Sequence, residues 1–223
     1  MDWARAIEIN HAALTRIVAA LIAMVGLVDG VAAARLPQFL YLKASQVLRP
    51  AESAVRRLIV IAARGLKVEV APPRPKLKGL VIARKGGGRV SFPLFDTPKR
   101  FGFVRRTYAK VQPRIRVIDF IPVFQPQHFI GPAPEPEPDR QVDAQRLRRR
   151  LAAVKLALET LPRQAMRLAR WRARRDRTQS AIVKSPLRSG PPPGHRSRPT
   201  DEIDTVLKEC HALARDALRQ DTS

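Results

Sequence analysis

The chain has 223 residues and a formal net charge of +23, and its one cysteine excludes an internal disulfide and therefore a disulfide-stapled secreted fold. Twenty prolines and only 5% aromatic residues leave few large side chains with which to build a core. We therefore predict a mainly α fold with a small β element, in which several helices are joined by proline-rich linkers and do not form one compact domain.

The first predicted region, residues 1–65, is helical and contains the apolar segment 12–34. Residues 17–28 read IVAALIAMVGLV without a polar side chain. A helix made of the eighteen residues between Arg16 and Arg35 would be about 27 Å long, close to the ~30 Å hydrocarbon core of a bilayer. The basic residues that follow it would hold the carboxyl side in the cytoplasm; they are Arg35, Lys43, Arg49, Arg56 and Arg57. Membrane association through residues 12–34 is one interpretation.

The same segment also has the pattern of a packed helix. Two interleaved heptad series run through it: Ile7, Leu14, Leu21 and Val28, and Trp3, Asn10, Ile17 and Met24. Such a seam needs a helical partner, and a helix that begins at Pro50 and ends before Gly65 would offer it an apolar side. A signal peptide cleaved near residues 32–34 is a third interpretation, which a long leading region without net charge disfavours.

Residues 66–124 are predicted to be a small, basic, β-rich region. Residues 66–70 alternate like a strand, residues 80–83 and 90–92 flank three glycines like a hairpin, and residues 114–124 are β-branched and aromatic. A phosphate loop is a poor interpretation of the glycines, because Arg89 follows them instead of lysine and a hydroxyl residue. Five aromatic residues stand among the basic ones, as in proteins that stack bases, but we favour a core role for them; they are Phe92, Phe95, Phe101, Phe103 and Tyr108.

Residues 125–139 form a proline-rich linker in this prediction, and residues 140–177 form arginine-rich helices. Asp139 would cap the first helix, whose apolar stripe is Leu147, Leu151, Val154, Leu158 and Leu161. Pro162 would end that helix and begin the next. The second helix carries the candidate polyanion-binding residues Arg163, Arg167, Arg170, Arg172, Arg174, Arg175 and Arg177. Because it has little apolar surface, we expect it to be solvated or bound to nucleic acid or an anionic lipid surface.

Residues 178–200 are predicted to be a disordered linker, and residues 201–223 a C-terminal amphipathic helix capped by Thr200. The apolar stripe of this helix is Ile203, Val206, Cys210, Leu213 and Ala217, so Cys210 is interpreted as a small core residue. Residues 201–218 are expected to pack against the helix over 147–161, against a partner helix, or against a second copy of the chain.

Four segments resemble conserved proteins of alphaproteobacterial type to which no function is attached. The segments are RPAESAVRRLIVIAARGL, LPRQAMRLARWRARR, SGPPPGHR and VLKECHALARDAL. The resemblance implies a location in the bacterial cytoplasm or at the cytoplasmic face of the inner membrane, and it implies no activity, cofactor or site residue.

Catalysis is the least expected class of function. The sequence offers no paired-carboxylate cleft, no nucleophile with a base, no metal cluster and no dinucleotide fingerprint, so we expect neither a cofactor nor a metal. We predict a non-catalytic basic accessory protein that binds a polyanion, nucleic acid without sequence specificity, through its arginine-rich helix. The alternatives are a membrane-associated protein anchored by residues 12–34 with a basic cytoplasmic body, and a helical assembly or interaction subunit.

Overall fold

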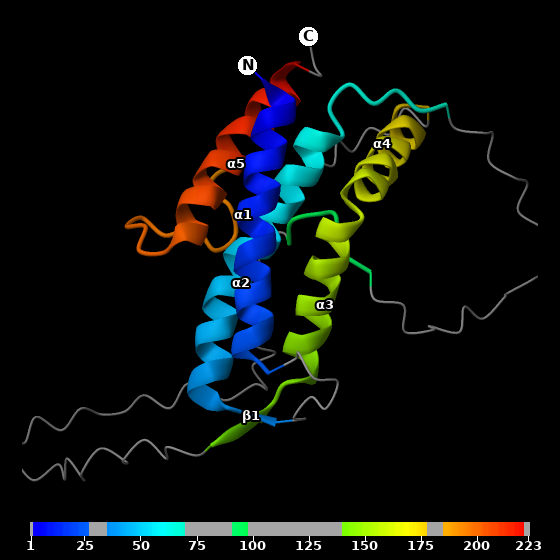
Figure 1. Cartoon of the computed structure of the whole chain (residues 1–223). Helices are drawn as coiled ribbons and strands as arrows, with labels where there is room; N and C mark the ends of the chain where they lie inside the picture. The colour runs from blue at the N-terminus through cyan, green and yellow to red at the C-terminus, as the bar shows by residue number, and fades with distance from the viewer. Residues whose placement is uncertain (1, 27–34, 70–90, 98–139, 178–184, 221–223) are drawn as a thin grey trace, which may run out of the picture.

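The computed structural model describes residues 2–26, 35–69, 91–97, 140–177 and 185–220. These residues form five helices and one antiparallel two-stranded sheet, which confirms a mainly α fold with a small β element. The elements in chain order are α1 (Trp3–Met24), β1 (Arg35–Pro37), α2 (Gln38–Ala62), β2 (Gln141–Asp143), α3 (Gln145–Glu159), α4 (Leu161–Arg177) and α5 (Glu202–Gln220) (Figure 1).

The central element is α2, which contacts the other four helices. Every residue from 53 to 61 is buried, so this half of α2 is enclosed on all sides. One hydrophobic cluster draws on all five helices and on the segments around Phe92 and Leu187. The start of α1 and the end of α5 lie at the same end of the molecule, and the sheet lies at the other (Figure 1).

The heptad seam predicted for α1 is confirmed as a packed helix face. Leu14, Ile17 and Leu21 are buried, and α1 contacts α2, α3 and α5. The polar member of the seam, Asn10, is also buried; its Nδ2 donates to Ala6 O at 2.9 Å and to Glu209 Oε1 at 3.2 Å. The Cys210 thiol donates to Asn10 Oδ1 at 3.3 Å. Cys210 is a core residue, as predicted, and burial raises the pKa of its thiol to about 12.

The membrane interpretation of residues 12–34 needs two corrections. First, α1 ends at Met24, followed by Val25 as C-cap and Gly26 at a φ of 68°, so the segment is not one continuous helix. Second, Arg56 and Arg57, expected as flanking charges, are buried. By length and composition α1 is long and apolar enough to cross a membrane, a criterion that core helices of soluble proteins and signal sequences also meet. Residues 27–34 lie outside the described part of the chain.

Pro50 lies inside α2 and does not begin a helix, contrary to prediction. The helix starts twelve residues earlier, where the Gln38 amide donates to Arg140 O at 2.9 Å. An internal proline costs about 3 kcal/mol because it removes one hydrogen bond of the helix. Burial of Ala44, Leu48 and Ala51 on either side of the proline offsets that cost. Gly65, predicted to follow the helix, does so with a φ of 68°.

The sheet is not where the sequence places it. β1 pairs with β2, with Leu36 opposite Val142, and joins segments more than a hundred residues apart. Residues 66–69 and 91–92, which were expected in strands, are not in strands. Leu36 is buried in the common core, so this short pairing is favoured by packing more than by strand propensity. The predicted strands within 70–90 and 98–139, and the proline-rich linker 125–139, lie outside the described residues.

The last third of the chain contains the predicted helices but differs from the prediction between them and at the start of α3. This helix begins at Gln145 with Ala144 as its N-cap, so it is not capped by Asp139 as predicted, and residues 141–143 form β2. A helix break at Thr160 separates α3 from α4, with Pro162 in the first turn of α4 as predicted. The apolar stripe of α5 is buried, but mainly against α2 and α1. At the start of this helix the carboxylate of Asp204, not the Thr200 hydroxyl, accepts hydrogen bonds from the Thr200 and Asp201 amides. Within the predicted disordered linker, residues 185–200 pack on the helices, with Pro186, Leu187, Pro192 and Pro193 buried.

Candidate polyanion interface

The arginine-rich helix α4 is fixed to the bundle by one apolar face. Leu161, Ala165, Leu168 and Ala169 are buried, and the helix contacts α2 and α3. The expectation that α4 has too little apolar surface to be held by the core is therefore wrong, because small alanines allow a close approach to α2. Packing sets the rotation of the helix about its own axis, and this rotation decides which arginines face outward.

Five of the seven predicted arginines form a single exposed stripe on α4. Their spacing of i, i+4, i+7, i+11 and i+14 keeps them within about 80° of one another around the helix and spreads them over about 21 Å of its length. They are Arg163, Arg167, Arg170, Arg174 and Arg177, and all are exposed. The one acid of α4, Asp176, lies on another side of the helix at this spacing. We call these five residues the arginine stripe.

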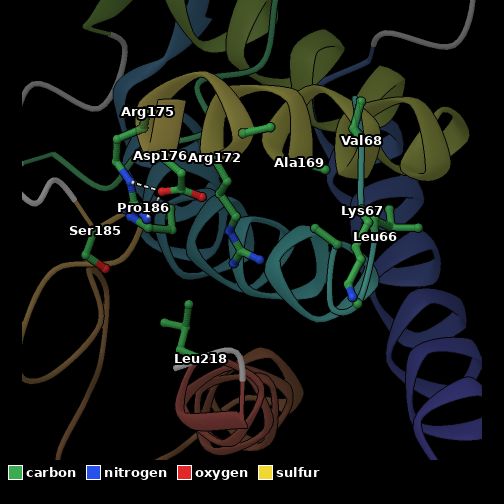
Figure 2. Close-up of a pocket in the computed structure, with 13 residues that line it drawn as sticks. Leu66, Lys67, Val68, Ala169, Arg172, Arg175, Asp176, Ser185, Pro186 and Leu218 are labelled. Atoms are coloured by element: carbon green, nitrogen blue, oxygen red, sulfur yellow. Dashed lines mark hydrogen bonds and ion pairs between the residues drawn. The ribbon is translucent and has the colours of Figure 1, made fainter. Parts of the chain in front are cut away.

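The remaining two predicted residues, Arg172 and Arg175, are half-buried and lie away from the stripe. They line a pocket of about 650 Å³ between α4, the end of α2 and the end of α5, with Leu66 and Leu218 among its apolar residues (Figure 2). Arg175 pairs with Asp176, at 2.9 Å between Nη2 and Oδ1. The predicted set of seven thus separates into an outward stripe and two arginines that face the interior side of the helix.

Residues 91–97 run beside α4 and are attached to it. Arg167 of the stripe donates through Nη1 to Phe92 O at 2.9 Å. Phe92 is buried, as predicted for a core residue, whereas Phe95 is 36% exposed. The ring of Phe95 contacts Trp171 edge to face, with 4.8 Å between ring centroids. Phe101, Phe103 and Tyr108 lie outside the described residues.

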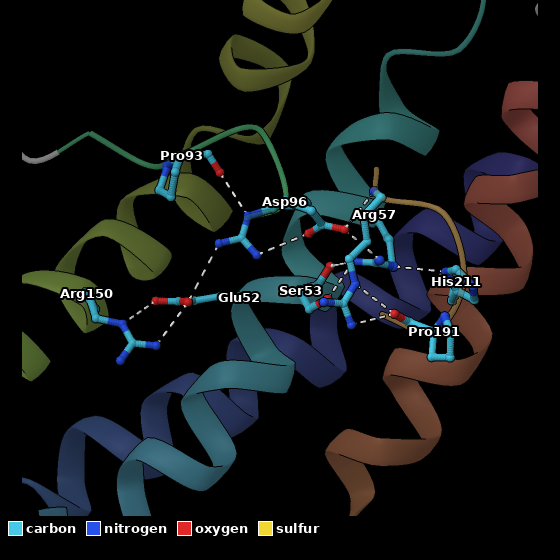
Figure 3. Close-up of polar contacts among 10 residues, drawn as sticks. Glu52, Ser53, Arg57, Pro93, Asp96, Arg150, Pro191 and His211 are labelled. Atoms are coloured by element: carbon cyan, nitrogen blue, oxygen red, sulfur yellow. Dashed lines mark hydrogen bonds and ion pairs between the residues drawn. The ribbon is translucent and has the colours of Figure 1, made fainter. Parts of the chain in front are cut away.

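A buried ionic network holds this segment against the central helix. The guanidinium of Arg57, whose side chain is 0% exposed, bonds Asp96 Oδ2 at 3.0 Å, Ser53 O at 2.7 Å and Ser53 Oγ at 2.5 Å. Its Nε donates to His211 Nδ1 on α5 at 3.1 Å (Figure 3). Burial lowers the pKa of Arg57, and the Asp96 carboxylate acts against that shift. Asp96 is therefore the countercharge that allows Arg57 to be buried.

Neighbouring charges extend the network to α3 and to the segment before α5. Arg56 contacts the other oxygen of Asp96 at 3.4 Å and donates to Pro93 O at 3.1 Å. Arg150 of α3 binds Glu52 through two hydrogen bonds of 2.8 and 3.1 Å. The Arg188 amide donates to Asp96 Oδ2 at 3.3 Å, and its side chain donates to Pro191 O (Figure 3). The network thus connects three helices and the two segments that flank α4.

The network gives His211 a pH-dependent role in stability. Its Nδ1 accepts from Arg57, so the ring must be neutral there, and burial together with Arg57 and Arg215 lowers the pKa of His211. As the pH falls, a histidine whose pKa is lowered in the folded state takes up a proton in the unfolded chain first. Its contribution to the free energy of unfolding is therefore present above about pH 6.5 and is lost as the pH falls. We expect the free energy of unfolding, measured with urea, to fall between pH 7 and pH 5.

The matched variant for this prediction is His211→Gln, whose amide oxygen can still accept from Arg57 but does not titrate. We expect a shallower pH dependence in this variant than in the wild type. Equal slopes in the two proteins would show that other groups cause the acid destabilisation.

The sequence located α4 and its arginines but missed Asp96 and Phe95 as partners of that region. One signal for Asp96 was present: two adjacent arginines, Arg56 and Arg57, interrupt the otherwise apolar run 54–63 and therefore require an acid. Comparison of the chain with protein-family models, curated proteins and solved structures finds no match.

Proposed function

We propose that this protein is a non-catalytic accessory protein that binds a polyanion, nucleic acid, through the arginine stripe of α4. The main support for this proposal is that five arginines lie on one exposed side of a helix whose opposite side is buried. Guanidinium groups bind phosphate oxygens in bidentate fashion, and contacts of this kind carry no sequence information. The expected binding is therefore strong at low salt and indifferent to sequence.

Rigidity of the helix supports this proposal. A flexible basic segment would lose conformational entropy on binding, whereas α4 is already held by α2 and α3. Successive stripe residues are about 5 Å apart along the helix axis, so a polyanion can contact several at once. Each phosphate that is neutralised releases counterions, which supplies the free energy of binding.

Membrane association is the second candidate, favoured by the length and apolar composition of α1. We prefer nucleic-acid binding to membrane association because five residues of α1, from Asn10 to Leu21, are buried against other helices. An assembly role through α5 has less support, because its apolar stripe is covered by α2 and α1 of the same chain. Binding to anionic vesicles, measured beside binding to nucleic acid, separates the first two candidates.

Replacing Arg163, Arg170, Arg174 and Arg177 together by glutamine is expected to weaken nucleic-acid binding by about tenfold or more at moderate salt. Arg167 is left in place because it also holds Phe92 O. The slope of log affinity against log salt should become shallower by about 0.9 for each duplex phosphate contact that is lost. Fluorescence anisotropy with a labelled duplex over a salt series measures both quantities.

A control variant removes the same number of charges elsewhere. Four exposed basic residues belong to β1 and to the first two turns of α2 and α3, at the other end of the molecule (Figure 1); they are Arg35, Lys43, Arg146 and Arg149. Their replacement by glutamine should leave most of the affinity in place. Equal losses in the two variants, or affinity that does not change with salt, would contradict the assignment to the stripe.

A further inference from the structure

An aromatic pair, of which Phe95 is the exposed member, lies beside the arginine stripe. Trp171 follows Arg167 by four residues and precedes Arg174 by three, so it is the neighbour of both on the helix surface. Trp171 is half-buried and supports the ring of Phe95, with 4.8 Å between centroids and 70° between ring planes. Phe95 as a residue is 36% exposed.

The backbone that carries Phe95 is held on both sides. Phe92 and Leu94 are buried in the core, and the Asp96 side chain is 1% exposed in the ionic network. Arg167 binds Phe92 O at 2.9 Å, and the Asp96 amide donates to Pro186 O at 3.0 Å. Burial alternates along residues 91–95, with Phe92 and Leu94 inside and Phe95 exposed, so the anchored neighbours direct Phe95 outward. An exposed ring on an anchored backbone loses little entropy on binding a ligand.

Two arginines lie next to Trp171: Arg175, which also pairs with Asp176, and Arg167 of the arginine stripe. The Arg175 guanidinium carbon lies 5.4 Å from the centroid of the Trp171 ring, and Arg167 lies one helical turn from Trp171 on the stripe side. A basic track next to exposed aromatic faces is the arrangement by which proteins hold single strands, whose phosphates follow the charges while bases stack on the rings. A duplex keeps its bases paired and stacked, so it would use the charges and not the rings.

We infer that Phe95, supported by Trp171, is a base-stacking platform, and that the ligand of the arginine stripe is single-stranded nucleic acid. This inference rests on the proposed function and narrows it to one class of ligand. DNA and RNA single strands share the chemistry that the site recognises, since stacking and phosphate contacts do not require the 2′-hydroxyl. Charge and stacking together predict tighter binding of a single strand than of a duplex of equal length.

The test uses the full chain and compares Phe95→Leu with the wild type. Leucine keeps an apolar side chain at this position and removes the flat ring. We expect affinity for labelled oligothymidylate and oligouridylate to fall about fivefold or more, while affinity for a duplex stays the same. Phe95→Tyr, which retains a ring, should bind single strands like the wild type. In a Trp3→Phe background, single strands should quench the fluorescence of Trp171, and a duplex should not.

Phe39→Leu is the matched control, because Phe39 is 63% exposed but lies at the start of α2, far from the stripe in the fold (Figure 1). This variant should bind single strands normally. Equal affinity for single strand and duplex, with no change in Phe95→Leu, would contradict the assignment of Phe95 as a stacking platform. The proposal that the arginine stripe binds a polyanion would still stand. Loss of vesicle binding in Phe95→Leu, without an effect on oligonucleotides, would overturn the stacking platform in favour of a lipid contact. A chain that binds no polyanion would overturn the proposed function as well.

Discussion

Asp96→Asn is expected to lower the free energy of unfolding by about 3–5 kcal/mol, because it leaves the buried charge of Arg57 without its countercharge. Arg57 is 0% exposed and Asp96 1% exposed, with 3.0 Å between Nη2 and Oδ2. Asparagine has nearly the same shape, so the loss reports charge and not packing. Arginine does not lose its proton under ordinary conditions, and therefore the guanidinium cannot escape the cost by neutralisation. Urea unfolding at neutral pH measures the change.

The control for Asp96 is an ion pair of similar length at the surface. Asp201 lies 2.7 Å from Arg196, and the two side chains are 48% and 33% exposed. Solvent screens such a pair, so Asp201→Asn should cost less than about 1 kcal/mol. If the two variants were equally stable, the buried network would not contribute to holding residues 91–97 in place.

A double-mutant cycle separates the pair from its surroundings. Arg57→Met removes the buried cation, so Asp96→Asn should cost much less in that background than in the wild type. Part of the cost will remain, because Arg56 also contacts Asp96 and the Arg188 amide donates to it. Additive effects of the two substitutions would contradict the view that Asp96 exists mainly to compensate Arg57.

The helices were the part of the fold that the sequence could predict. Heptad spacing identified the buried faces of α1 and α5, since each helix buries a stripe along its own length. Pro162 located the boundary between α3 and α4 because a proline is best tolerated in the first turn of a helix, where its missing amide would have no helical partner. These signals are local, and they depend on residues within a few turns of one another.

Contacts between distant segments could not be predicted from the same patterns. Nothing in RLP or QVD indicates that β1 pairs with β2, because three residues carry too little alternation to identify a partner. Pro50 was misinterpreted because local rules treat proline as a breaker, whereas burial on both sides carries the helix through it. At the candidate site, the arginines were evident as a block, but their division into a stripe and an inner pair depends on which face of α4 is buried.

Gly194→Ala is the second substitution with a large expected effect, about 2–5 kcal/mol. Gly194 has a φ of 84°, which costs an alanine roughly 1–2 kcal/mol. A Cβ at this position would also lie 2.7 Å from Pro50 N and 2.9 Å from Pro50 Cα. Both atoms are backbone of the buried central helix and cannot move aside, so overpacking adds about 1–3 kcal/mol. Residues 185–200 should then detach from α2.

Gly65→Ala is the matched control, because Gly65 has a similar φ of 68° but nothing within 4 Å of the added Cβ. Its cost should be limited to the backbone conformation, about 1–2 kcal/mol, and the difference between the two variants isolates the contact with Pro50. Detachment of residues 185–200 should also expose the buried Asp96, which accepts from the Arg188 amide. Hydrogen exchange of that amide should therefore accelerate in Gly194→Ala and not in Gly65→Ala. Equal stability losses and equal exchange would show that residues 185–200 are not packed against the central helix in solution.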